Sequence, residues 1–190
     1  MVFDLITFKG STAMELVFGR PLDTTTREAK EIKIYDFLDG LGIEYQRIDH
    51  QPAATMEACE EVDKVLNATI CKNLMLCNRQ QTDFYLLLMP GNKPFKTKDL
   101  SAQIGTSRLS FATPMHMEQY LDVTPGSASV LALINDKDKV VRLLIDEDVL
   151  SGEYFGCHPC VNTTSLKIKT ADLLDIILPS ISVYPIFVKL

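Results

Sequence analysis

The chain has 190 residues, of which 46% are hydrophobic and 23% charged, as is ordinary for a globular protein. Its net charge of −6 argues against long, sequence-independent contact with a nucleic-acid backbone, because such contact needs clustered Lys and Arg. No apolar run approaches the roughly 20 residues that span a bilayer, and the N-terminus lacks the basic segment of a secretory signal peptide. We therefore expect a cytoplasmic protein with one sizeable core and no membrane contact.

Residues 1–24 contain two short apolar clusters and are expected to form an N-terminal extension to a domain of residues 25–190. The extension could pack on that domain or on a neighbouring subunit, so a homodimer stays open. Apolar residues at helical spacing predict a helix from Ile32 to Leu41, with N-cap hydroxyls at 24–26. The sequence does not decide which surface the extension covers.

Two hairpins are expected farther along the chain. The first covers residues 72–90, and its second strand, 84–89, is apolar throughout, so both of its faces should be buried. The second covers residues 129–145 across a polar turn. The other expected elements are strands at 43–48, 165–169 and 186–188, a helix at 56–66 capped by Thr55, and helices at 97–104, 115–121 and 171–178, the last capped by Thr170 and ended by Pro179. Because hairpins and helical crossovers alternate, we expect a single α/β domain with a mixed sheet.

The cysteines raise the question of a metal site or a redox pair. There are five, an odd number that suits a reducing compartment better than a disulfide framework. Cys157 and Cys160 form a C-x-x-C pair, typical of a metal site or a redox pair. A closed zinc site needs four ligands, however, and Cys71 and Cys77 make a poor second pair. The β-branched residues after Pro159 favour an extended segment over the helix that follows a thioredoxin-type pair. We expect no metal and no cofactor.

Five short motifs follow one another along the chain. They are His50-x-Pro52 with Thr55-x-Glu57-Ala58, Lys72-Asn73-Leu74-Met75-Leu76, Leu109-Ser-Phe-Ala112, Val123-Thr-Pro-Gly-Ser127, and His158-Pro159 with Asn162-Thr163. Together they resemble the YbaK/ProX family of editing deacylases, over about residues 28 to 178. The resemblance implies a YbaK-like fold, a barrel-like and mostly antiparallel sheet flanked by helices. The freestanding ProX or PrdX branch, which deacylates Ala-tRNA(Pro), is the most similar.

The resemblance also implies catalytic roles for Lys72, Gly126 and His158. Lys72 can hold a phosphate or ribose as a point charge, and Gly126 lets backbone N–H groups approach a developing oxyanion. His158 would lie at the pocket wall. From position alone, these residues could equally be a snorkelling lysine, a Pro-Gly turn and a structural histidine. Expected substrate-binding residues are Asn73, Ser127, Ala128, Ser129, Val130 and Asn162, whereas His50 and His116 are interpreted as surface or packing residues.

Two positions depart from the family's pattern. The family's loop is Gly-x-x-x-Pro, and here it is Gly126-x-x-x-Val130, so an N–H is restored and two conformational restraints are relaxed. The segment 98–100 is Lys-Asp-Leu near where many relatives carry Asp-Leu-Lys. A local basic cluster nevertheless remains, since Lys93, Lys96 and Lys98 lie within six residues. Taken alone, that cluster favours a solvated loop over an RNA contact.

The implied function is a trans-editing hydrolase whose substrate is a tRNA acceptor end carrying a small amino acid, with alanine on tRNA(Pro) the first candidate. A synthetase discriminates one methylene by only about 1–3 kcal/mol, so a second site must remove the errors. The resemblance implies that the substrate's own ribose hydroxyl assists and that no metal is needed. One alternative is a non-catalytic sensor of tRNA or amino acid, favoured by Val130 and the acidic charge. Another is a thiol or zinc protein, which rests only on Cys157 and Cys160.

Overall fold

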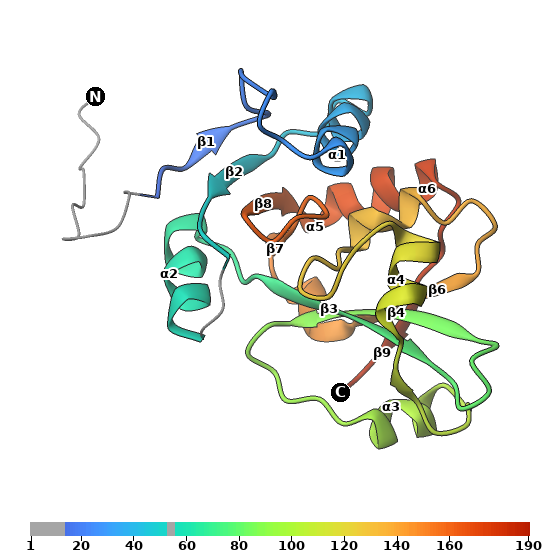
Figure 1. The fold of residues 1–190 in the computed structure, drawn as a ribbon. Coiled ribbons are helices and arrows are strands. Elements are labelled where there is room, and N and C mark those ends of the chain that lie inside the picture. Colours follow the sequence, from blue (N-terminus) through green and yellow to red (C-terminus); the bar gives the residue numbers. More distant parts are fainter. Residues whose placement is uncertain (1–13, 53–55) are drawn as a thin grey trace.

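The computed structural model describes residues 14–52 and 56–190 of the chain (Figure 1). Its strands are β1 Val17–Phe18, β2 Gln46–Asp49, β3 Cys71–Cys77, β4 Phe84–Pro90, β5 Ser110–Phe111, β6 Val141–Asp146, β7 Tyr154–Cys157, β8 Thr164–Lys169 and β9 Ile186–Val188. Its α-helices are α1 Ala29–Gly40, α2 Met56–Leu66, α3 Thr97–Gln103, α4 Pro114–Leu121, α5 Thr170–Asp172 and α6 Leu178–Ser180. Two 3-10 helices are η1 Val130–Ile134 and η2 Glu147–Ser151, and a π-helical segment, η3 Leu173–Ile177, joins α5 to α6.

The strands form two sheets, one with the order β1-β2-β8-β7 and one with the order β5-β3-β4-β6-β9. All neighbouring pairs are antiparallel except β4 with β6 and β6 with β9. The prediction of a mixed α/β domain with mostly antiparallel strands is therefore confirmed. The barrel-like closure is not found in the described residues, where the two sheets stay separate and touch through the parallel bridge between Ile70 and Gly156.

The predicted hairpin of β3 and β4 is confirmed. Its turn is held by the buried side chain of Asn78, whose Oδ1 accepts from the N–H groups of Thr82 and Asp83. Strand β4 is buried along its length, as expected for an apolar strand covered on both faces. Helix α3 lies against one face of this sheet, and α4 and η1 lie against the other (Figure 1).

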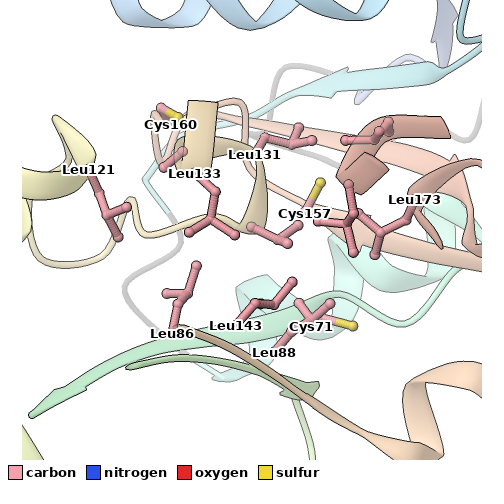
Figure 2. Close-up of a cluster of buried hydrophobic side chains, with 14 of the residues drawn as sticks. Cys71, Leu86, Leu88, Leu121, Leu131, Leu133, Leu143, Cys157, Cys160 and Leu173 are labelled. Atoms are coloured by element: carbon pink, nitrogen blue, oxygen red, sulfur yellow. The ribbon is translucent and has the colours of Figure 1, made fainter. Parts of the chain in front are cut away.

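The larger core cluster joins the two sheets. Figure 2 shows Leu86, Leu88 and Leu143 from the five-stranded sheet facing Leu131 and Leu133 of η1. The same cluster takes in Cys71 at the start of β3 and Cys157 at the end of β7. These two strand ends, which carry the motif residues Lys72 and His158, are thus fixed by the same packed core.

The predicted hairpin of residues 129–145 is wrong. Residues 130–134 form the 3-10 helix η1, capped by Ser129, whose Oγ accepts from the N–H of Leu131 at 3.2 Å. Strand β6 instead pairs in parallel with β4. A short apolar run suits a buried strand and a buried helical turn equally well, so periodicity could not separate them. The cap and the buried carboxylate of Asp136, which accepts from the N–H groups of Val140 and Val141, favour the helical turn.

Three expected helix ends also differ from the prediction. Residues 24–26 do not cap α1, whose N-cap is Glu28 without a side-chain bond, because Thr24 instead closes a turn with Arg27. The last helix continues through Pro179 to Ser180 after the π-helical segment, a wider turn that tolerates the missing N–H. The hydroxyl of Thr170 donates to the carbonyl of Gly152 rather than capping that helix.

The described part of the N-terminal segment packs on the rest of the chain. Strand β1 pairs with β2, and the N–H of Gly19 donates to the carbonyl of Tyr45 at 2.9 Å. Residues 1–13, and Thr55 with its expected cap, lie outside the described residues. Within the described ranges, none of the helices has the length and apolar character needed to cross a bilayer.

Candidate functional site

Lys72 lies near the start of β3, paired with Met89 of β4. Alternate residues of β3 point to opposite faces, so Lys72 faces away from the larger core, into which Cys71 and Met75 point. Its Nζ donates to the backbone carbonyl of Lys93 at 2.5 Å. Burial lowers the pKa of its ammonium group, because a partly desolvated charge is disfavoured. Lys72 is therefore a cation held in a defined position by one of its three donors.

The loop that holds Lys72 is anchored by an ion pair. The Nζ of Lys93 lies 2.8 Å from Asp146 and 2.6 Å from Asp148. Asp146 is fully buried at the end of β6, whereas the side chain of Asp148 is 59% exposed. The charge of Lys93 is thus paired inside the protein, so Lys93 does not contribute a free cation to the basic cluster with Lys96 and Lys98.

The loop after α4 is shaped by Gly126 and its own serines. Gly126 has φ +89, a conformation that favours glycine, and a Cβ there would lie 3.7 Å from Nδ2 of Asn162. The hydroxyl of Ser127 donates to the carbonyl of Thr124 at 2.9 Å, and that of Ser129 caps η1. Both serines are buried, as is Val130, and Ala128 packs against the core. The serine hydroxyls therefore stabilise the loop, which leaves the backbone as its clearest ligand-binding group.

His158 follows β7 and is surrounded by polar groups. Its Nδ1 lies 2.8 Å from the carbonyl oxygen of Thr164 and 3.4 Å from Oγ of Ser165. The Oγ of Ser165 lies 2.9 Å from Nε2 of His50, and the two histidine ring centroids are 6.1 Å apart. Burial lowers the pKa of His158, and the neighbouring His50 lowers it further, while the Thr164 bond opposes them. His158 is thus favoured in its neutral form.

The bridge between the two sheets relates Lys72 and His158 by register. Ile70 pairs with Gly156 in parallel, and the N–H of Gly156 donates to the carbonyl of Thr69 at 2.9 Å. A Cβ on Gly156 would approach Ile70 to about 2.9 Å, so only glycine permits this contact. Lys72 and His158 each lie two residues beyond the bridge. By the alternation of strand residues, both point away from the larger core, into which Cys71 and Cys157 point.

Asn73 lies on the other face of β3 from Lys72. Its Nδ2 donates to the carbonyl of Cys71 at 3.3 Å. Its Oδ1 is buried and has no hydrogen-bond partner within the described residues. The structure thus brings Gly126 close to Asn162, and it places Lys72 and His158 two residues beyond the same bridge. The loop from His158 to Asn162 connects the two pairs, whereas Asn73 faces the core side.

A cavity of about 470 Å³ lies next to these groups but is lined by none of the nine predicted site residues. Its walls come from the ends of β3 and β4, the loop that follows β4, η2 and β7. The lining residues are Thr69, Cys71, Pro90, Asn92, Lys93, Asp148, Val149, Ser151, Gly152, Tyr154 and Phe155. One of the lining residues, Lys93, is the residue whose carbonyl accepts the hydrogen bond from Lys72.

Cys157 and Cys160 are both fully buried. Burial raises the pKa of both thiols, that of Cys160 to about 12. The described residues include no group of three or more His, Cys, Asp or Glu side chains that could hold a metal ion. Both side chains belong to the core cluster of Figure 2, which is the structural role that the geometry gives them.

Sequence reasoning missed three residues around the site. Ser165 and Asp146 were not considered, and His50 was interpreted as a surface or packing residue. His50 falls within the first family-like motif, and that signal could have identified it as a candidate site residue. Ser165 and Asp146 lie in strands, where nothing local distinguishes a buried polar residue from a solvent-facing one.

The fold is shared with solved structures. One of them, described as a proposed trans-editing enzyme for prolyl-tRNA synthetase, superposes with a TM-score of 0.63 at 14% identity and covers 86% of this chain and 98% of that one. At this identity the likeness shows the fold alone. Residues 50–176 match the family model of the aminoacyl-tRNA editing domain, so the chain belongs to this family. The predicted resemblance is confirmed.

Two relatives show how much of the chain is shared. The chain is 30% identical over 140 residues to the prolyl-tRNA editing protein ProX of Acetoanaerobium sticklandii, covering 74% of this chain and 85% of that protein. It is 28% identical over 144 residues to a prolyl-tRNA synthetase associated domain-containing protein 1 of Danio rerio, covering 75% and 78%. The likeness therefore extends over most of each protein.

Proposed function

We propose that this chain is a trans-editing hydrolase that deacylates mischarged tRNA(Pro). The observation that carries the proposal is its 30% identity to a prolyl-tRNA editing protein over 85% of that protein's length. Family membership supports an ester hydrolase acting on aminoacyl-tRNA. The approach of Gly126 to Asn162, and the bridge two residues before Lys72 and His158, support a site between β3 and the two loops.

The proposed substrate is the acceptor end of tRNA(Pro) carrying alanine. A proline-activating enzyme cannot reject every smaller amino acid by binding alone, since a missing methylene changes binding by only about 1–3 kcal/mol. A second site that admits alanine and excludes proline by size would remove the error. We also propose a cytoplasmic location, since Cys71, Cys77, Cys157 and Cys160 are unpaired and suit a reducing compartment. A homodimer remains a hypothesis that sedimentation velocity would test.

Each grouped residue has a role that its surroundings support. The ammonium group of Lys72 donates one N–H to the carbonyl of Lys93. Its two other N–H donors can bind a phosphate or ribose oxygen of the terminal nucleotide. The backbone around Gly126 can offer N–H groups to the carbonyl oxygen of the ester as negative charge develops. An ester beside a ribose hydroxyl requires positioning more than a protein nucleophile, so these contacts suffice for hydrolysis.

The decisive experiment compares the release of amino acids from several charged forms of tRNA(Pro). We expect faster hydrolysis of Ala-tRNA(Pro) than of Pro-tRNA(Pro), with the Cys and Ser forms measured alongside to define the size limit. A His116→Gln variant is a matched control, because His116 lies on α4 at the cap made by Thr113 and outside the proposed site. Tight tRNA binding without hydrolysis of any form would contradict the enzyme and favour the sensor.

A further inference from the structure

The protons on two histidine rings are assigned by their partners. The Nδ1 of His158 lies 2.8 Å from the carbonyl oxygen of Thr164, and the Nδ1 of His50 lies 2.8 Å from that of Gln51. A carbonyl oxygen can only accept a hydrogen bond, so each Nδ1 carries the proton. In the neutral form, the Nε2 of each ring is therefore an acceptor.

Ser165 connects the two rings. Its Oγ lies 2.9 Å from Nε2 of His50, which in that tautomer can only accept, so the hydroxyl donates to His50. The lone pairs of the same oxygen face Nδ1 of His158 at 3.4 Å. Ser165 is fully buried on β8, paired with Ile48 of β2, so its position is set by the sheet. The chain of bonds thus runs in one direction, from His158 through Ser165 to His50.

The charged groups around this chain are paired among themselves. The hydroxyl of Thr164 lies 3.1 Å from Glu31 and 3.0 Å from Asp49, and Arg27 contacts both carboxylates. Asp49 also contacts Arg47. Together with burial, these surroundings keep His158 neutral.

The Nε2 of His158 is the free end of this chain, since it has no hydrogen-bond partner within the described part of the protein. We propose that Ser165 and His50 are positioning residues that hold His158 as the neutral Nδ1–H tautomer, so that Nε2 accepts a hydrogen bond from the α-ammonium group of the aminoacyl ester. The identity of that donor rests on the proposed function, whereas the tautomer and the roles of Ser165 and His50 do not. A neutral acceptor suits an ammonium group, which an imidazolium would repel.

The first test uses the free protein and needs no activity. Long-range 15N–1H NMR correlations distinguish a ring protonated at Nδ1 from one protonated at Nε2. We expect the Nδ1–H form at His158 and His50 in the wild type at neutral pH. In Ser165→Ala the Thr164 carbonyl still accepts from Nδ1 of His158, so we expect that proton to stay while the ring nitrogen signals of His158 and His50 shift as their link is lost. His116 serves as the internal control, and its signals should stay unchanged. An Nε2–H form of His158 in the wild type, or ring signals of His158 and His50 that do not shift in Ser165→Ala, would overturn the proposal.

The second test separates positioning from simple structure. In Ser165→Ala we expect kcat/KM on Ala-tRNA(Pro) at pH 7 to fall about fivefold, the factor that corresponds to one neutral hydrogen bond. The wild-type rate should fall at acid pH as His158 becomes protonated, below its ordinary pKa of about 6.5. His50→Gln, at a half-buried position, gives a second variant if Ser165→Ala fails to fold. Unchanged kinetics in both variants would overturn the proposal, while an inactive wild type with the expected tautomers would overturn only the proposed function.

Discussion

The two sides of the candidate site are held by different kinds of interaction. On the β3 side, Lys72 is positioned by a loop whose anchor is the ion pair of Lys93 with Asp146 and Asp148. On the other side, serine hydroxyls hold the loop at 124–130, and the carbonyl of Thr164 holds the neutral ring of His158. The positive charge of Lys72 is therefore fixed on the β3 side, while His158 on the other side is held without a charge of its own.

This difference should appear in how each side responds to mutation. Removing one partner of a buried ion pair leaves a charge in a poor environment, which costs more than losing one neutral hydrogen bond. The ion-pair anchor on the β3 side should therefore be sensitive in both stability and activity, while Lys72 itself and the loops should be sensitive mainly in activity. Three substitutions, from the largest expected effect to the smallest, test this contrast.

Lys72→Ala should lower kcat/KM by about 100-fold or more, the range found when one positioned electrostatic donor is removed. Stability should change little, because Lys72 is only partly buried and its ammonium is already disfavoured there. Deacylation kinetics and a thermal melt measure the two effects. Lys72→Arg is the matched control, which keeps the charge but changes its geometry. Full turnover and full tRNA affinity in Lys72→Ala would show that the β3 side does not act in the reaction.

Asp146→Asn should destabilise the protein by about 2–3 kcal/mol, because the ammonium of Lys93 loses its fully buried partner. Activity should fall with it, since the carbonyl that holds Lys72 belongs to Lys93. Asp148→Asn removes the exposed partner of the same lysine and should cost less than about 1 kcal/mol. Urea unfolding of both variants measures the difference. Equal losses of stability in the two variants would show that the buried Asp146 and the exposed Asp148 stabilise Lys93 to the same extent.

Val130→Pro should change stability by no more than about 1 kcal/mol. Val130 opens η1, a position that suits proline, and Ser129 before it has φ −149 and ψ 146, which a following proline permits. We expect the choice of amino acid removed to change more than the rate. Competition between Ala- and Ser-tRNA(Pro) measures that choice. An inactive wild type that this substitution restores would instead identify Val130 as the mark of a degenerate editor.

The sequence predicted the elements that have strong local signals. The β3–β4 hairpin follows from two apolar runs around a polar turn, and α4 begins at Pro114 as expected for a first helical turn. The segment 130–134 has no local signal of this kind, because an apolar run without polar interruptions has no measurable period. Its cap by Ser129 and the pairing of β6 with β4 are both needed to fix it as a 3-10 helix.

The candidate site was predictable only where motifs marked it. Lys72, Gly126 and His158 came from the resemblance, and they remain proposals for function that the variants above test. The bonds of Ser165 to His50 and of Asp146 to Lys93 span 115 and 53 residues, so neither partner could be inferred from its neighbours in sequence. Such pairs are created by the arrangement of the sheets.

The buried thiols allow the opening of the core to be measured by chemical labelling. Four cysteines are buried, namely Cys71, Cys77, Cys157 and Cys160, and burial raises the pKa of Cys71 to about 12. A thiol reagent needs both access and a thiolate, so these groups should stay unlabelled while the core is closed. Because Cys71 and Cys157 lie where the two sheets meet, the rate of their labelling measures how often that junction opens. Mass spectrometry of the labelled chain would time the separation of the two strand ends that carry Lys72 and His158.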